Sequence, residues 1–103
     1  RMVRWQRLYS REYEMESMDV LIMDPRGLHA QNASQLVAMA MEFPNQTKIS
    51  VVSQDGRRLD ARSPMRLLSA GFTCGDALRI EADGPDEREA VQRIARLVRS
   101  WGQ

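Results

Sequence analysis

The sequence is poor in the residues that build disulfides and metal sites. Its 103 residues include one cysteine, Cys74, and one histidine, His29. A single thiol cannot form an internal disulfide, which is typical of a reducing compartment, and we therefore expect a cytoplasmic protein. One thiol and one imidazole are also too few for a zinc site, and we expect no bound metal or cofactor.

Long apolar runs are missing as well. No stretch approaches the roughly 18 consecutive apolar residues that a membrane span needs, and no secretory signal pattern opens the chain. The hydrophobic share of 43% and the charged share of 28% are ordinary for a globular domain. We therefore predict one folded domain with its own core and no membrane span.

The basic charge is confined to the start of the chain. Four arginines and no acidic residue fall within residues 1–11, so the rest of the chain carries −3 within a net charge of +1. This slightly acidic body argues against nucleic-acid binding. We interpret residues 1–14 as a basic extension and residues 15–103 as the domain. The arginine spacing is compatible with a short amphipathic helix for a partner or anionic surface, and equally with a frayed tail.

Seven segments carry the pattern of a strand or a helix. Alternating apolar residues or β-branched runs predict four short strands, at residues 18–23, 49–52, 58–61 and 77–82. We expect the first of these strands to be well buried. Helical spacing of apolar residues, or a capping residue, predicts three helices, at residues 29–43, 64–70 and 86–99. This order predicts an α+β fold, most simply a four-stranded antiparallel sheet covered on one face by three helices.

The only histidine stands where a turn leads into the first predicted helix. The turn is Asp24-Pro25-Arg26-Gly27, and Leu28 separates it from His29. Unpaired backbone N–H groups and the positive end of the helix dipole gather at such a position and favour an anion. An imidazole there can accept a phosphoryl group whose oxygens find these donors. From the residues alone, a purely capping role for His29 stays open.

The residues around His29 resemble the active-site entry of HPr, the phosphocarrier of the bacterial sugar phosphotransferase system. The motif is Asp24-Pro25-Arg26-Gly27-Leu28-His29-Ala30. The likeness continues through the turn at residues 54–58, the segment 61–71 and the stretch that begins at Ala82-Asp83-Gly84. It covers about residues 15–101, with a small apparent insertion at residues 44–48. The resemblance implies the open-faced β-sandwich fold of that family.

The resemblance also implies a chemical role. His29 would be phosphorylated on Nδ1 by a phosphoenolpyruvate-dependent enzyme and would pass the group to an acceptor protein. The implied partners are an enzyme I-like donor and a IIA-like acceptor, or regulatory targets. Ser63 would occupy the position that a regulatory kinase modifies in some members, although its place before Pro64 also fits a plain helix cap.

Two residues after His29 depart from the family pattern. Gln31 stands where the family usually has an arginine, and it brings hydrogen bonds without charge. Asn32 stands where the family has a proline, and we expect it to constrain the backbone less firmly. Arg26, three residues before His29, is a candidate to supply the positive charge that Gln31 lacks. A regulatory or scaffold homologue with weak or no phosphotransfer is therefore an alternative function, and an unrelated interaction module is a third.

A further set of residues matches the surface that HPr-like proteins use to dock onto partners. Its members are Ser34, Ala38 and Met41 on the first helix and Met65 and Leu68 on the short helix. Methionine suits such a role because its flexible side chain adapts to different surfaces. Simple core packing is the alternative for Met65 and Leu68.

Overall fold

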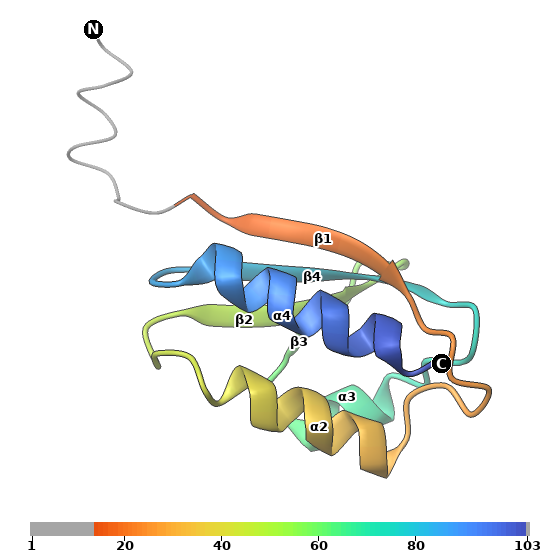
Figure 1. Cartoon of the computed structure of the whole chain (residues 1–103). Helices are drawn as coiled ribbons and strands as arrows, with labels where there is room; N and C mark the ends of the chain where they lie inside the picture. Colours follow the sequence, from red (N-terminus) through yellow and green to blue (C-terminus); the bar gives the residue numbers. More distant parts are fainter. Residues whose placement is uncertain (1–13, 103) are drawn as a thin grey trace, which may run out of the picture.

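A computed structural model of the chain describes residues 14–102. Within these residues, four strands and three helices follow one another (Figure 1). They are β1 (Glu16–Leu21), α2 (Ala30–Ala40), β2 (Lys48–Ser53), β3 (Arg58–Asp60), α3 (Pro64–Ser69), β4 (Ala77–Asp83) and α4 (Glu87–Ser100). The possible amphipathic helix in residues 1–11, and almost all of the predicted extension, lie outside the described residues.

The four strands form one antiparallel sheet in the order β1-β4-β2-β3. Apolar residues meet across the strands on the inner face, where Val20 lies opposite Leu78 and Val51 lies opposite Ile80. The three helices cover this face and leave the other open (Figure 1). The predicted α+β fold, an open-faced sandwich, is thereby confirmed.

The first strand differs from its prediction. It spans Glu16–Leu21 rather than residues 18–23, and it is buried on one side only. Val20 is buried, whereas Leu21 and Met23 are exposed. The expectation of a well-buried strand is wrong because β1 lies at the edge of a sheet whose second face is uncovered, so alternate side chains face solvent.

The first helix is shorter than the predicted span of residues 29–43. It ends at Ala40, and tight turns follow in which the N–H of Phe43 donates to the Ala40 carbonyl oxygen over 3.3 Å. Proline disfavours a helical conformation in the residue before it, so Pro44 explains why Phe43 lies outside the helix. Phe43 is nevertheless buried in the core, which accounts for the apolar pattern that suggested a longer helix.

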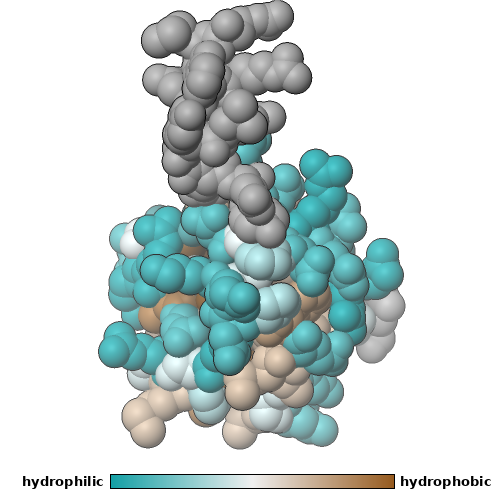
Figure 2. Space-filling view, turned by 90° about the vertical axis from the view of Figure 1, so that its left-hand side faces the viewer, coloured by the Kyte–Doolittle hydropathy of each residue, from teal (hydrophilic) through white to brown (hydrophobic). Residues whose placement is uncertain are grey.

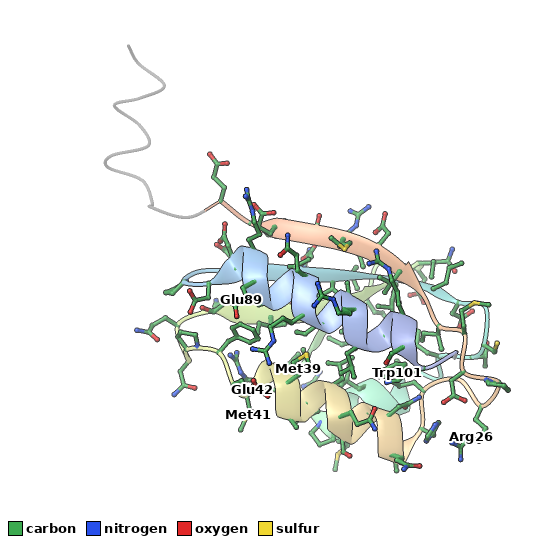
Figure 3. All side chains as sticks on the ribbon, viewed as in Figure 1. Arg26, Met39, Met41, Glu42, Glu89 and Trp101 are labelled. Atoms are coloured by element: carbon green, nitrogen blue, oxygen red, sulfur yellow. The ribbon has the colours of Figure 1, made fainter. Side chains whose placement is uncertain are left out.

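Helix α2 is held against α4 through its buried face and through two polar contacts, one at its middle and one beyond its end. Leu36 packs in the same core as Ile94 of α4. At the middle of α2, Trp101 Nε1 donates to Gln35 Oε1 over 3.0 Å. Beyond its end, an Arg93 guanidinium nitrogen lies 2.7 Å from a Glu42 carboxylate oxygen. Figure 3 shows Trp101 and Glu42 near opposite ends of this helix pair. Both contacts join α2, or the turn that follows it, to α4.

Within residues 14–102, no helix combines the length and the apolar character that crossing a bilayer requires. In the same part of the chain, no three His, Cys, Asp or Glu side chains gather as a set that could hold a metal ion.

Candidate active site

A tight turn leads from the end of β1 into α2. The Asp24 carbonyl oxygen accepts the N–H of Gly27 over 2.8 Å, and the Asp24 carboxylate accepts the N–H of Arg26 over 2.9 Å. Gly27 has a φ of +69°, and a Cβ atom there would lie 2.4 Å from the Phe72 carbonyl oxygen. Leu28 then donates its N–H to that same oxygen over 3.1 Å. Glycine is therefore required at residue 27, where the turn packs against the neighbouring loop.

His29 is the capping residue of α2. Its backbone is extended, with φ −136° and ψ 177°, and its N–H donates to Asn32 Oδ1 over 2.8 Å. The imidazole in turn faces the backbone of Asn32, so the two residues form a capping box. The next two residues, Ala30 and Gln31, occupy helical positions whose N–H groups have no intrahelical acceptor. The ring thus lies beside the donors that the sequence predicted.

The His29 ring is held from its other side by a carboxylate. Its Nε2 lies 3.1 Å from Asp24 Oδ2, and its side chain keeps 22% of its surface exposed. Because Nε2 points to Asp24, the ring nitrogen that faces the first turn of α2 is Nδ1. The ring is partly exposed, and in this orientation Nδ1 faces the first turn of α2.

Asn32 ties these parts together. Its side-chain N–H group donates to the Gly27 carbonyl oxygen over 2.9 Å and to Asp24 Oδ2 over 3.3 Å, while its oxygen accepts the His29 N–H. The side chain is buried, with 3% exposure. Three hydrogen bonds therefore anchor the turn and the helix start through this residue. The expectation that Asn32 constrains the backbone less firmly than a proline stays a prediction.

Asp24 is the site residue that the sequence analysis missed. The N–H of Arg26 and then the His29 ring hold the pKa of the Asp24 carboxyl below its usual value, so it is an anion at neutral pH. The sequence assigned Asp24 only to a turn. Its available signal was the position itself, because an aspartate that opens a turn often bonds to the backbone two residues later and so points toward the segment that follows.

The other two candidates near the ring stand further out. Gln31 is exposed at the second position of α2. Arg26 projects from the loop before α2 (Figure 3), with 69% of its side chain exposed, and its Nε lies 3.8 Å from Asp24 Oδ1. The structure thus brings Arg26 to the carboxylate that holds the ring. Its predicted role in supplying charge to the site stays a prediction.

Ser63 lies on another helix and caps it. Its Oγ accepts the N–H of Arg66 over 3.3 Å, and Pro64 takes the first position of α3. The predicted structural role of Ser63 is therefore confirmed. Its suggested regulatory modification stays a prediction.

The residues expected to form a docking surface are all exposed. Ser34 and Ala38 face outward from α2, Met41 follows that helix, and Met65 and Leu68 lie on α3. Met65 exposes 79% of its surface, so core packing does not explain the apolar residue there. Figure 2 shows a largely hydrophilic face with hydrophobic side chains at mid-height and paler brown, moderately apolar ones at its lower end.

Comparison with known proteins places this site in a family. Residues 16–100 match the family model described as the PTS HPr component phosphorylation site. The chain is 34% identical over 84 residues to the phosphocarrier protein HPr of Cupriavidus necator, covering 82% of this chain and 91% of that protein. It is 36% identical over 84 residues to the phosphocarrier protein HPr of Haemophilus influenzae, covering 82% of this chain and 95% of that protein.

A solved structure agrees with these relatives. The crystal structure of HPr-C-His from Thermoanaerobacter tengcongensis matches with a TM-score of 0.76 and 30% identity, covering 85% of this chain and 97% of that chain. The resemblance expected from the sequence is thereby confirmed. The chain belongs to the HPr family, the phosphocarriers of the bacterial phosphotransferase system.

Proposed function

We propose that His29 is the residue on which this HPr-family chain carries a phosphoryl group from one protein to another. The observation that supports it is the orientation of the ring. Nε2 is held at Asp24, and Nδ1 faces the start of α2, where the amides of Ala30 and Gln31 lack intrahelical acceptors. A phosphate on Nδ1 would lie at the positive end of the helix dipole.

The transfer needs no cofactor. The lone pair on Nδ1 forms a bond to phosphorus while the bond from phosphorus to the donor breaks, and that electron pair stays with the donor. The phosphate oxygens then accept hydrogen bonds from the amides at the start of α2. In the second step, a nucleophile on the acceptor protein attacks phosphorus, and the electron pair of the N–P bond returns to Nδ1.

The partners of this relay are other phosphotransferase proteins. We assign an enzyme I-like protein as donor and a IIA-like protein as acceptor, both in the cytoplasm. The exposed residues Ser34, Ala38, Met41, Met65 and Leu68 offer these partners an apolar surface beside the site. A phosphate on Ser63 would lie next to this surface, at the first turn of α3, and would add negative charge there.

Gln31 favours a second candidate function. A hydrogen bond that involves a charged group contributes about 1.5–3 kcal/mol, and the glutamine offers no charge to the phosphoryl group. A loss of this size slows transfer by about one to two powers of ten. A regulatory homologue that keeps the fold and the docking surface, but transfers poorly, is therefore the alternative.

One labelling experiment distinguishes the two functions. The chain is incubated with labelled phosphoenolpyruvate and a general phosphotransferase enzyme, and the bound phosphate is tested for stability. A carrier acquires phosphate that is labile in acid and stable in alkali, and the His29→Ala variant acquires none. Gln54→Ala, a surface variant in the exposed turn between β2 and β3, serves as a control for folding and keeps label on His29. No label on the wild-type chain after long incubation supports the regulatory function instead.

A further inference from the structure

Building on the proposed function, we propose that Asp24 is a positioning residue for His29. Its carboxylate holds the proton on Nε2, which leaves Nδ1 as the free nucleophile, and it pairs with the positive charge that the ring gains on phosphorylation. The assignment starts from the 3.1 Å contact between His29 Nε2 and Asp24 Oδ2.

The contact selects one form of the imidazole. A neutral imidazole carries one proton, on either Nε2 or Nδ1, and an ionised carboxylate can only accept a hydrogen bond. Nε2 must therefore be the protonated nitrogen when it bonds to Asp24, and Nδ1 keeps its lone pair. This is the nitrogen that faces the first turn of α2, where a phosphate would find its hydrogen-bond donors.

The carboxylate is itself held in place. Oδ1 accepts the N–H of Arg26 over 2.9 Å, and Oδ2 accepts an N–H of Asn32 over 3.3 Å in addition to the His29 contact. The Asp24 side chain has 13% of its surface exposed, so few water molecules compete for it. An anchored carboxylate loses little freedom when it binds the ring, and this makes it an effective orienting group.

Asn32 helps to hold both the Asp24 carboxylate and His29. A proline at this position, as in the family pattern, has no side-chain amide and could make neither the bond to Asp24 nor the bond to the His29 N–H. Asn32 makes both, at 3.3 Å and 2.8 Å. The asparagine at residue 32, where the family has a proline, therefore supplies a hydrogen bond to the Asp24 carboxylate, and the two residues together orient His29.

The pair also matters after phosphorus has been attached. With phosphorus on Nδ1 and a proton on Nε2, the ring is a cation, and the Asp24 carboxylate lies beside the N–H of that cation. When the acceptor protein takes the phosphoryl group, the electron pair of the N–P bond returns to Nδ1 and the proton remains on Nε2. A neutral imidazole then leaves, which is a better leaving group than an imidazolate anion.

The test is to observe the protons of the His29 ring directly. Long-range ¹H–¹⁵N spectra of the labelled full chain at neutral pH distinguish a proton on Nε2 from one on Nδ1. We expect the Nε2-protonated form to dominate in the wild-type chain and Asp24→Asn to shift the ring toward a mixture, because the amide can donate as well as accept. Asn32→Ala, which loosens the carboxylate, should give a smaller shift in the same direction.

The control is the same substitution at a remote ion pair. Asp19 pairs with Arg79 on the open face of the sheet, at 2.9 Å, so Asp19→Asn should leave the ring spectrum unchanged. Amide spectra report whether each variant is folded. A wild-type ring protonated on Nδ1, or an Asp24→Asn variant that is folded and has the wild-type proton distribution, would overturn the assignment.

A kinetic arm separates this inference from the proposed function. With the phosphorylated donor enzyme, Asp24→Asn should slow single-turnover transfer to His29 by about tenfold or more, the loss of one charge-assisted hydrogen bond. If neither the wild-type chain nor Asp24→Asn is ever labelled while the ring protons shift as expected, the proposed function fails and the positioning role of Asp24 stands. If the wild-type chain and Asp24→Asn are labelled equally fast, the positioning role fails and the carrier function stands.

Discussion

At the scale of the residue, the site depends on short polar side chains that bond to nearby backbone. Asp24 and Asn32 each join the turn to the first residues of α2, and His29 lies between them. Such local bonds are what make aspartate and asparagine common at turns and helix starts. Gln31 lies outside this network, because its side chain is exposed. Its contribution to transfer can therefore be changed without disturbing the way the ring is held.

Gln31→Arg should make the chain a better phosphoryl acceptor. A guanidinium at residue 31 can donate two parallel hydrogen bonds to phosphate oxygens and add a positive charge, neither of which glutamine provides. We expect the rate of His29 phosphorylation to rise about tenfold, measured with a phosphorylated donor enzyme at fixed ionic strength. Gln54→Arg, in the exposed turn between β2 and β3, is the matched control and should not change the rate. An unchanged rate for Gln31→Arg would show that residue 31 does not contact the phosphoryl group.

Asp24 should also give the protein a defined response to acid. Because the Arg26 N–H and the His29 ring lower the pKa of its carboxyl from the usual 3.8, ionised Asp24 stabilises the folded state at neutral pH. The contribution is present above the unfolded-state pKa and is lost as the pH falls through the lower, folded-state value. In urea titrations, Asp24→Asn should be less stable than wild type at pH 6, and the difference should shrink below about pH 3.8. A difference that persists unchanged at pH 2.5 would contradict this.

The sequence was sufficient to single out His29, because the position of one residue between a turn and a periodic helix is a property of the chain alone. The contact with Asp24 was not accessible in this way. It requires the turn to bring residues five apart to within 3.1 Å, and it requires both side chains to point into the same space. The turn pattern indicates that Asp24 bonds to nearby backbone, but it does not give the position of the His29 ring.

At the scale of the element, the turn before α2 depends on two loops approaching closely. Gly27 and Gly71 have nearly the same positive φ, +69° and +72°. A Cβ atom at Gly27 would lie 2.4 Å from backbone of the Phe72 loop, whereas one at Gly71 would meet nothing within 4 Å. A comparison of Gly→Ala at the two positions therefore separates two losses of stability, one from the backbone conformation and one from the close contact.

Gly27→Ala should be much more harmful than Gly71→Ala. Each variant should lose about 1–2 kcal/mol of folding stability because a residue with a side chain is forced into a left-handed conformation. Gly27→Ala should lose about 1–3 kcal/mol more because its Cβ displaces the neighbouring loop. Urea denaturation measures both losses. Because the displaced loop carries the turn with it, Gly27→Ala should also slow His29 phosphorylation, while Gly71→Ala should not. Equal losses of stability for the two variants would show that the loops can separate freely.

At the scale of the whole molecule, the sheet is assembled from segments far apart in the sequence. Strand β1 pairs with β4, and Asp19 meets Arg79 across these strands at 2.9 Å. Periodicity predicted four strands and three helices in the right order, because the inner face of the sheet repeats every two residues and each helix face every three or four. It did not predict the order β1-β4-β2-β3, since the pattern within a strand does not identify its neighbour. For the same reason the sequence did not place the first strand at the edge of the sheet.

The helices cover one face of the sheet, and His29 lies on this side, at the start of α2. A partner that reaches His29 therefore also meets the outer surface of the helices. Met65 exposes 79% of its surface on α3, and Met15, before β1, exposes 50%. A glutamine at either position removes apolar surface that was already in water, so Met65→Gln and Met15→Gln should each change stability by less than about 0.5 kcal/mol. Only Met65→Gln should weaken partner binding, because only Met65 lies on the predicted docking surface. We expect the KM for the donor enzyme to rise about fivefold with little change in kcat, the cost of an interface residue worth about 1 kcal/mol. Equal KM values for the two variants would show that donors approach His29 from another side.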